Sequence, residues 1–163
     1  MPEKKYEPKL IAFFCNWCTY TAADLAGVSR MKYAPNVRVI RIMCSGRIDP
    51  QFILQAFASG ADGVLIGGCH PGDCHYSEGN YKLLRRFRLL KRMLKTMGIE
   101  EARCRLEWIS ASEGDKVKEV INDMVDKLKM LGPLGIPKHL ADFDKEIKIT
   151  DEIFKIEEVL EHA

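Results

Sequence analysis

The stretch GVLIGGC, residues 63–69, has the pattern of a buried strand that ends at a cysteine. A short, continuous apolar run bounded by glycine is typical of a strand inside a parallel sheet. Two other stretches repeat this pattern, KLIAFFC at residues 9–15 and NVRVIRIMC at residues 36–44. A fourth strand is predicted at residues 105–110, RLEWIS. The sequence therefore predicts a sheet in which three strands each lead directly to a cysteine.

Helical patterns separate the predicted strands. Residues 19–33 can form a helix, and Asp49-Pro50 resembles an N-cap followed by a proline in the first turn, which would open a helix through Phe57. Residues 81–97 and 115–131 carry apolar side chains at helical spacing. Strands that alternate with helices predict an α/β fold, a small open parallel sheet with helices on both faces, as in flavodoxin-like proteins.

Length and composition fit an ordinary folded domain. The chain has 163 residues, of which 47% are hydrophobic and 29% are charged. The segment GPLGIP breaks the last predicted helix, so we expect one domain at residues 1–131 and a charged, helical extension or partner-docking tail at residues 132–163.

We expect no nucleic-acid partner and no membrane-spanning segment. The net charge of +2 is too small to indicate nucleic-acid binding. No apolar stretch is long enough to span a bilayer, and the N-terminus lacks the pattern of a signal peptide. We therefore expect a soluble, cytoplasmic protein.

Five of the six cysteines lie at or just beyond the predicted strand ends. Cys15, Cys44 and Cys69 follow the first three strands, and Cys18 and Cys74 lie in the loops that come next. In a reducing cytoplasm such cysteines indicate metal binding or redox chemistry rather than structural disulfides. Because the carboxyl ends of parallel strands meet at one edge, we expect all five in one pocket, where backbone amides of the glycine-rich loops could donate to sulfur.

This set of cysteines fits more than one metal. An iron–sulfur cluster needs four thiolates in most cases, which would leave one of the five spare, and the residues alone do not show which. A structural four-cysteine zinc site would use the same ligands, but such sites usually form in small domains without a large core. The spacing favours iron–sulfur. We interpret Cys104, which precedes the fourth strand, as a core residue near the opposite edge of the sheet.

A thiol–disulfide exchanger is the main alternative. Cys15 and Cys18 form a C-x-x-C pair between a strand and a helix, as in thioredoxin-like proteins, and a helix N-terminus would lower the thiol pKa. This alternative leaves the other three cysteines of the edge unexplained. His70 and His75 could ligate a metal, donate to cluster sulfur or carry a proton. We expect both to lie beside the ligands rather than among them, because the excess of cysteines argues against a Rieske-type histidine pair.

The predicted helix at residues 81–97 is strongly basic. It carries seven lysines and arginines and no carboxylate. Such a face can simply be solvated, but an acidic protein partner is the favoured functional interpretation, since electrostatic steering accelerates docking. The candidate docking residues are Arg85, Arg86, Arg88 and Arg92. The acidic amphipathic segment at residues 143–163 could lie on this helix or reach another subunit.

Three blocks of the sequence resemble a known family. FFCNWCTYTAADLAG (13–27), RIMCSGRIDP (41–50) and GVLIGGCHPGDCHYSEGN (63–80) are similar to the signature blocks of the delta subunit of methyl-viologen-reducing [NiFe]-hydrogenase, a likeness that covers roughly the first 130 residues. The resemblance implies a flavodoxin-like domain that carries a [2Fe–2S] cluster. The candidate ligands that it implies are Cys15, Cys18, Cys44, Cys69 and Cys74.

The resemblance also implies a role. In methanogenic archaea that family connects the small and large subunits of the hydrogenase to the flavin-containing subunit of heterodisulfide reductase, where flavin-based electron bifurcation occurs. Similar domains link formate dehydrogenase to the same reductase. The chain would then be a non-catalytic electron-transfer subunit of an oxidoreductase used in methanogenesis. Consistent with this role, the sequence contains no catalytic acid–base pair and no Walker-type phosphate loop.

Overall fold

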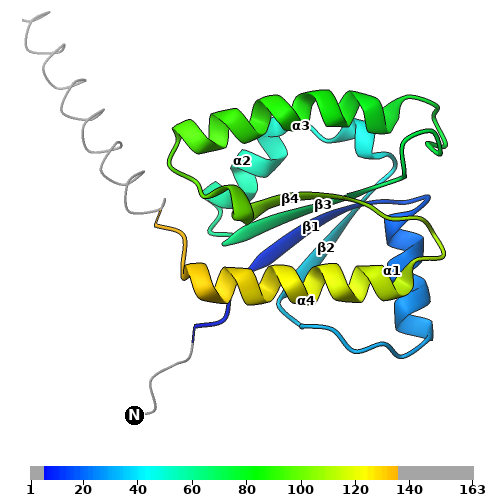
Figure 1. Ribbon diagram of the computed structural model, residues 1–163, viewed down its shortest axis with the longest axis horizontal. Coiled ribbons are helices and arrows are strands. Elements are labelled where there is room, and N and C mark those ends of the chain that lie inside the picture. Colours follow the sequence, from blue (N-terminus) through cyan, green and yellow to red (C-terminus); the bar gives the residue numbers. More distant parts are fainter. Residues whose placement is uncertain (1–5, 136–163) are drawn as a thin grey trace, which may run out of the picture. The chain divides into compact units, whose positions relative to one another are not determined.

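The computed structural model describes residues 6–135 (Figure 1). The described elements are the strands β1 (Leu10–Cys15), β2 (Val37–Ile42), β3 (Gly63–Gly68) and β4 (Cys104–Trp108), the helices α1 (Thr19–Val28), α2 (Pro50–Ala58), α3 (Gly79–Thr96) and α4 (Gly114–Leu131), and the 3₁₀ turns η1 (Ser45–Arg47) and η2 (Glu101–Arg103). The predicted tail lies, apart from its first four residues, outside the described residues.

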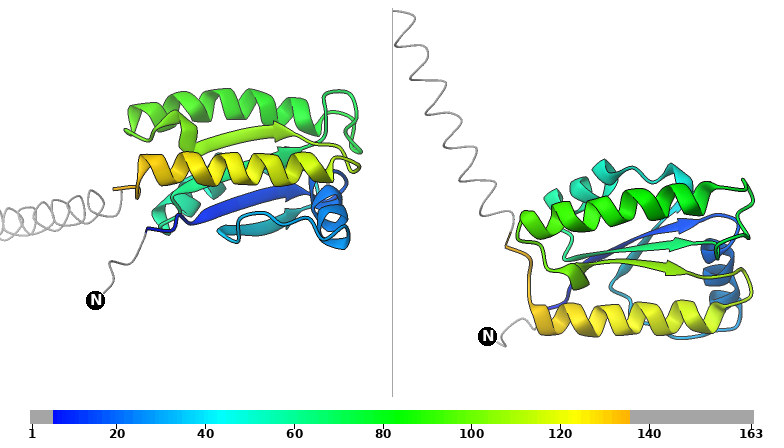
Figure 2. Two further views of the ribbon diagram at one scale, coloured as in Figure 1. Left: turned by 60° about the horizontal axis from the view of Figure 1, so that its bottom comes forward. Right: turned by 45° about the horizontal axis from the view of Figure 1, so that its top comes forward.

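The strands form one parallel sheet in the order β2-β1-β3-β4. Helices α1 and α4 lie on one side of the sheet and α2 and α3 on the other, as Figures 1 and 2 show. The predicted open parallel sheet with helices on both faces is thus confirmed. All four strands point the same way, so the loops that follow them gather at one edge of the sheet. Among the helices at residues 6–135, none combines the length and the hydropathy that a bilayer-spanning segment requires.

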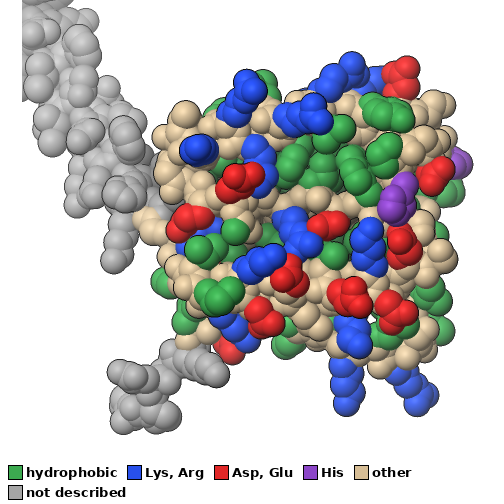
Figure 3. Space-filling view, in the orientation of Figure 1, with side chains coloured by type: hydrophobic (Ala, Val, Ile, Leu, Met, Phe, Trp, Pro, Cys, Tyr) green, Lys and Arg blue, Asp and Glu red, His purple; other side chains and the backbone are tan. Residues whose placement is uncertain are grey.

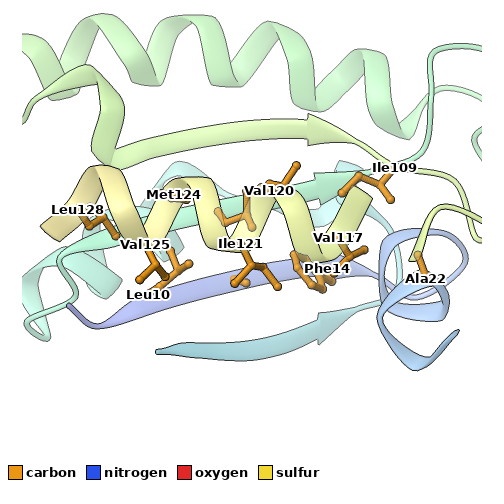
Figure 4. Packing of buried hydrophobic residues seen from close by; sticks show 12 residues of the cluster. Leu10, Phe14, Ala22, Ile109, Val117, Val120, Ile121, Met124, Val125 and Leu128 are labelled. Atoms are coloured by element: carbon orange, nitrogen blue, oxygen red, sulfur yellow. The ribbon is translucent and has the colours of Figure 1, made fainter. Parts of the chain in front are cut away.

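A core beneath α4 holds the central strands in place (Figure 4). Alternate residues of β1 point to the same face, and Leu10, Ala12 and Phe14 are fully buried there. The apolar stripe of α4 covers them with Val117, Val120, Ile121, Met124, Val125 and Leu128. Burial of each large aliphatic side chain contributes roughly 1.5–3 kcal/mol, so this layer fixes the strands from which the cysteine loops emerge.

The element boundaries differ from the predicted ones by a few residues, with one larger exception. The helix predicted at residues 19–33 ends at Val28, because Arg30 adopts a left-handed conformation with φ of 54°. The predicted start of α2 is confirmed, since the Asp49 carboxylate accepts a hydrogen bond from the amide of Gln51 at 2.9 Å and Pro50 occupies the first turn.

A glycine lets α1 approach the end of β3. A Cβ atom on Gly67 would lie 2.4 Å from Cγ2 of Thr19, the first residue of α1, and Thr19 is fully buried. Any larger residue at this position would therefore push the helix away from the strand. The contact brings Cys18, at the N-cap of α1, close to Cys69 just after β3.

The basic helix α3 is exposed along one side, and Figure 3 shows lysine and arginine side chains along this part of the surface. Arg85, Arg88 and Arg92 are exposed. Arg86 differs from them, because it is only partly exposed and its guanidinium donates to the carbonyl of Gly46 in the loop after Cys44. It therefore ties α3 to the cysteine edge.

Candidate metal centre

The five predicted cysteines do come together at the carboxyl edge of the sheet, but in two groups. The sulfurs of Cys15, Cys18 and Cys69 all lie within 4.8 Å of one another. Cys44 and Cys74 form a separate pair, with their Sγ atoms 3.8 Å apart. All five side chains are buried. The expected single pocket is therefore a site with two neighbouring sets of thiols.

The first group is built by neighbouring strands. Cys15 is the last residue of β1, and Cys69 comes directly after β3, which pairs with β1 in the sheet. Their Sγ atoms are 3.8 Å apart. Cys18 reaches the group from the N-cap of α1, where its sulfur also contacts the hydroxyl of Thr19 at 3.6 Å.

The second group is built by loops and by the start of α3. Cys44 precedes η1, and the amide of Gly46 donates to its sulfur at 3.3 Å. Gly79, the first residue of α3, lies against both sulfurs: a Cβ there would be 2.3 Å from Sγ of Cys44 and 3.0 Å from Sγ of Cys74. The backbone of α3 therefore forms one wall of this pair, and only glycine leaves room for the sulfurs.

The amide of Gly46, in one of the glycine-rich loops, donates to a sulfur as predicted, and other backbone amides influence Cys15 and Cys74. The backbone amides of Trp17 and Ser45 act, after the neighbouring thiols, to lower the pKa of Cys15. Burial acts to raise the pKa of Cys74, but donation from the amides of Tyr76 and Asn80 outweighs it, and the pKa is lowered. Asn80 lies in the first turn of α3, where the helix dipole also favours negative charge. Such donors stabilise thiolates, which are the metal-binding form of cysteine.

Hydrogen bonds among the three thiols of the first group shift their pKa values in opposite directions. Hydrogen bonds from Cys18 and then from Cys69 lower the pKa of Cys15 to about 2. The hydrogen bond with Cys15 in turn raises the pKa of Cys18 to about 11, and it raises the pKa of Cys69 as well. A metal ion that binds such a group displaces the remaining protons of its ligands.

The predicted histidines make contacts with residues other than the cysteines. The Nε2 atom of His70 lies 2.8 Å from the Glu113 carboxylate. The ring of His75 stacks on Trp17 with 3.8 Å between ring centroids, and the Trp17 indole donates to the hydroxyl of Tyr76 at 3.4 Å. These aromatic rings connect the loop between Cys15 and Cys18 with the loop after Cys74, an association that the sequence pattern did not indicate.

Two further buried polar residues were not predicted from the sequence. The Asn80 side chain donates to the carbonyls of Cys69 and His70, at 3.3 and 2.7 Å, and so holds the loop between Cys69 and Cys74. Ser45 is fully buried, and its hydroxyl has no hydrogen-bond partner among the described residues. Leaving such a group unpaired costs about 1–3 kcal/mol. Both residues lie inside the three sequence blocks, but their burial has no signature in the sequence.

Cys104 behaves as predicted. It begins β4, at the other end of the sheet from the cysteine groups, and it is 1% exposed. Burial raises the pKa of its thiol to about 12. It is a core residue rather than a ligand candidate.

Burial also bears on the predicted dithiol pair. A thiol exchanger must present its attacking sulfur to another protein. The side chains of Cys15 and Cys18 are only 1% and 5% exposed. This geometry disfavours thiol exchange, and it suits a buried metal centre.

The fold and the cysteine edge together define a class, a small α/β protein with a buried group of thiols that could hold a metal. The chain belongs to the methyl-viologen-reducing hydrogenase delta subunit family, whose model matches residues 10–132. The family resemblance seen in the three sequence blocks is thereby confirmed.

Several relatives are close. The chain is 56% identical over 142 residues to the iron–sulfur subunit of the vhc F420-non-reducing hydrogenase of Methanococcus voltae, and the match covers 87% of this chain and 99% of that protein. It is 55% identical over 130 residues to the iron–sulfur subunit of an F420-non-reducing hydrogenase of Archaeoglobus profundus, covering 80% and 95% of the two chains.

A third relative shows the domain within a larger protein. The chain is 48% identical over 128 residues to one of the subunits of the ferredoxin/F420H2-dependent CoB-CoM heterodisulfide reductase of Methanosarcina acetivorans. The match covers 78% of this chain but only 16% of that protein. Domains of this kind therefore occur both as separate hydrogenase subunits and within a longer reductase polypeptide.

Proposed function

We propose that this chain is an electron-transfer subunit that carries one [2Fe–2S] cluster and relays electrons from a [NiFe]-hydrogenase, or from formate dehydrogenase, to the flavin-containing subunit of heterodisulfide reductase. The names of its relatives support the proposal, since they are iron–sulfur subunits of hydrogenases and one subunit of heterodisulfide reductase. In this role it would work in the cytoplasm and supply electrons to flavin-based bifurcation.

The observation that carries the proposal is the presence of two thiol pairs, each with sulfurs 3.8 Å apart. Metal–thiolate bonds of about 2.3 Å in tetrahedral geometry put two sulfurs on one metal about 3.8 Å apart. A [2Fe–2S] cluster has two irons with two protein ligands each. We assign Cys15 and Cys69 to one iron and Cys44 and Cys74 to the other, which leaves Cys18 as the fifth cysteine.

A zinc site fits these distances less well. One tetrahedral ion needs four ligand atoms that are all about 3.8 Å from each other. In the described part of the chain, the group of cysteines within 4.8 Å of one another has three members, and it includes neither Cys44 nor Cys74. Zinc would therefore leave this second pair without a role.

The protein's own residues would set the properties of the centre. The bound cluster supplies one-electron transfer. Burial of the thiols excludes water from the sulfurs, and the amides around Cys15 and Cys74 stabilise negative charge on them. His70 and His75 would act from beyond the ligands, because their rings contact Glu113 and Trp17.

The exposed arginines of α3 are the proposed docking residues. Arg85, Arg88 and Arg92 are accessible to an acidic partner, whereas Arg86 is committed to the Gly46 carbonyl and would support the loop instead. The segment at residues 132–163 is proposed as a further docking tail beyond the cluster domain at residues 1–131.

The test is anaerobic purification with analysis of iron, zinc and acid-labile sulfide, followed by EPR of the dithionite-reduced protein. We expect about two irons and two sulfides per chain and an S = 1/2 signal. Stoichiometric zinc without sulfide would replace the proposal with a structural metal site. A folded, metal-free protein whose Cys15 and Cys18 cycle between dithiol and disulfide would replace it with thiol exchange.

Single cysteine-to-serine variants test the ligand assignment. We expect Cys44→Ser and Cys74→Ser, and likewise Cys15→Ser and Cys69→Ser, to lose most of the iron or to change the EPR g-values. Cys18→Ser should keep the iron content and the EPR g-values of the wild type. Cys104→Ser is the matched control, because that thiol is equally buried but lies away from the site. Loss of the signal in Cys18→Ser with retention in Cys15→Ser would reverse their assignments.

A further inference from the structure

Ser45 is a buried residue with an unused hydrogen-bond donor at the cysteine edge. It is 0% exposed, and its Oγ atom has no hydrogen-bond partner among the described residues. It follows Cys44 directly, so it lies in the loop that carries one of the proposed ligands. Within residues 6–135, the buried Ser45 hydroxyl therefore has no hydrogen-bond acceptor.

The backbone of Ser45 is already committed. Its carbonyl accepts a hydrogen bond from the amide of Ile48 at 3.1 Å. This hydrogen bond and the covalent link to Cys44 fix the residue beside one of the proposed thiol pairs. The position of the hydroxyl is set by this backbone.

A glycine on the neighbouring strand makes room for this side chain. A Cβ atom on Gly68 would lie 3.0 Å from Oγ and 3.2 Å from Cβ of Ser45, and 2.9 Å from the ring of Trp108. Gly68 immediately precedes Cys69, another proposed ligand. The Ser45 hydroxyl is thus enclosed by residues next to Cys44 and Cys69, at the place where the proposed ligands converge.

We propose that the Ser45 hydroxyl donates a hydrogen bond to a sulfur of the bound cluster and raises its reduction potential. The inference rests on the proposed function, because it needs a cluster at this edge. Reduction adds negative charge to the cluster, and a donor to sulfur stabilises the reduced form more than the oxidised form. Ser45 would be a positioning residue that tunes the potential at which the chain accepts electrons.

The buried hydroxyl of Thr19 provides a contrast. Thr19 is also fully buried at this edge, but its Oγ1 already contacts the sulfur of Cys18 at 3.6 Å. Among the buried serine and threonine residues of the described chain, Ser45 is therefore the one whose hydroxyl is free to donate to an added acceptor.

The experiment is an EPR-monitored redox titration of the full chain with its cluster, comparing wild type with Ser45→Ala. We expect iron and sulfide contents to be unchanged and the potential to become more negative. A tenfold loss in the equilibrium constant for one-electron reduction would appear as a shift of about 59 mV. Ser110→Ala is the matched control. Ser110 also follows a strand, β4, at this edge of the sheet, but its hydroxyl already contacts the hydroxyl of Ser112. Its potential should equal that of the wild type.

A spectroscopic readout separates hydrogen bonding from a packing effect. In pulsed EPR of protein exchanged into D2O, Ser45→Ala should lose one exchangeable deuteron coupling that Ser110→Ala retains. An unchanged potential together with an unchanged deuteron coupling would overturn the inference and leave a cluster without this donor. Wild-type protein without iron and sulfide would instead refute the proposed function, so the two failures are distinguishable.

A second measurement covers the case in which Ser45→Ala does not retain its cluster. Wild-type protein can be prepared with deuterium on the Cβ atoms of serine. Ser45 is the buried serine of the described chain, so its Cβ deuterons should give the strongest coupling to the reduced cluster. Absence of any strong coupling from this label would place Ser45 away from the cluster and refute the inference.

Discussion

Replacement of Gly79 by alanine tests whether the pair formed by Cys44 and Cys74 holds metal. Gly79 is the first residue of α3, and its Cα hydrogen faces both sulfurs. A Cβ atom at this position would lie 2.3 Å from Sγ of Cys44 and 3.0 Å from Sγ of Cys74. The helical backbone of this residue is not strained, so the expected effect comes from the new methyl group alone.

The size of the displacement follows from these distances. Ordinary van der Waals contacts of a Cβ atom begin near 3.4 Å. The sulfur of Cys44, or the start of α3, must therefore move by at least about 1 Å. Metal sites tolerate departures of about 0.2 Å in their ligand distances. The required movement is several times larger, so Gly79→Ala should strongly reduce cluster occupancy.

The assay is iron and sulfide content per folded chain, with circular dichroism to confirm the fold. Gly27→Ala is the matched control, because Gly27 lies in α1 and a Cβ there would have nothing within 4 Å. That control should keep its iron and gain about 0.5–1 kcal/mol in stability from reduced chain entropy. Full iron content and wild-type EPR in Gly79→Ala would refute the assignment of Cys44 and Cys74 as ligands.

Three further substitutions probe the rest of the domain. Arg103→Met should lower the free energy of unfolding in urea by about 1–3 kcal/mol, because this buried guanidinium donates to the backbone carbonyls of Gly132 and Leu131 and binds the half-exposed Glu100 carboxylate at 2.6 Å; an unchanged free energy would contradict this. Cys104→Ala should keep its full iron content, and its free energy of unfolding in urea should fall by about 1 kcal/mol. A loss of iron in this variant would show that Cys104 is a ligand. Hydrogen bonds from the amide of Ser110 and then from His70 lower the pKa of Glu113 to about 2 from 4.5. The stabilisation of the folded state by the ionised Glu113 carboxylate is therefore complete above pH 4.5 and is lost as the pH falls toward 2. In thermal unfolding, Glu113→Gln should therefore be less stable than wild type near pH 7, and the difference should shrink toward pH 2; a difference that does not depend on pH would refute this.

The strands and their cysteines were predictable because they depend on local patterns. A continuous apolar run that ends in glycine and cysteine marks both a buried strand and a ligand at its end, and GVLIGGC at residues 63–69 has both features. The convergence of these cysteines followed from one topological rule, that the carboxyl ends of parallel strands share an edge. The end of α1 was not predictable in the same way, because a single left-handed residue, Arg30, terminates it.

The division of the cysteines into pairs could not be derived from the sequence. Cys69 and Cys74 are only five positions apart, yet Cys69 lies beside Cys15 and Cys74 lies beside Cys44. This arrangement depends on how the start of α3 folds back on the loop after Cys44. Arg86 illustrates the same limit: it belongs to a basic surface stripe in the sequence, but it binds the Gly46 carbonyl in the structure.

The two edges of the sheet are stabilised by different means, and this separation suits an electron carrier. At the amino edge, the buried Arg103 binds the carbonyls of Asp62 and Gly132, so side-chain charge ties the end of α4 to the sheet. At the carboxyl edge, backbone amides and the Asn80 side chain hold the cysteine loops. Backbone donors are fixed by the fold and do not titrate, so the surroundings of the sulfurs should change little when an electron arrives. In the proposed electron carrier, a small structural response to charge would permit fast outer-sphere transfer, and it would leave the reduction potential to individual donors, as we propose for Ser45.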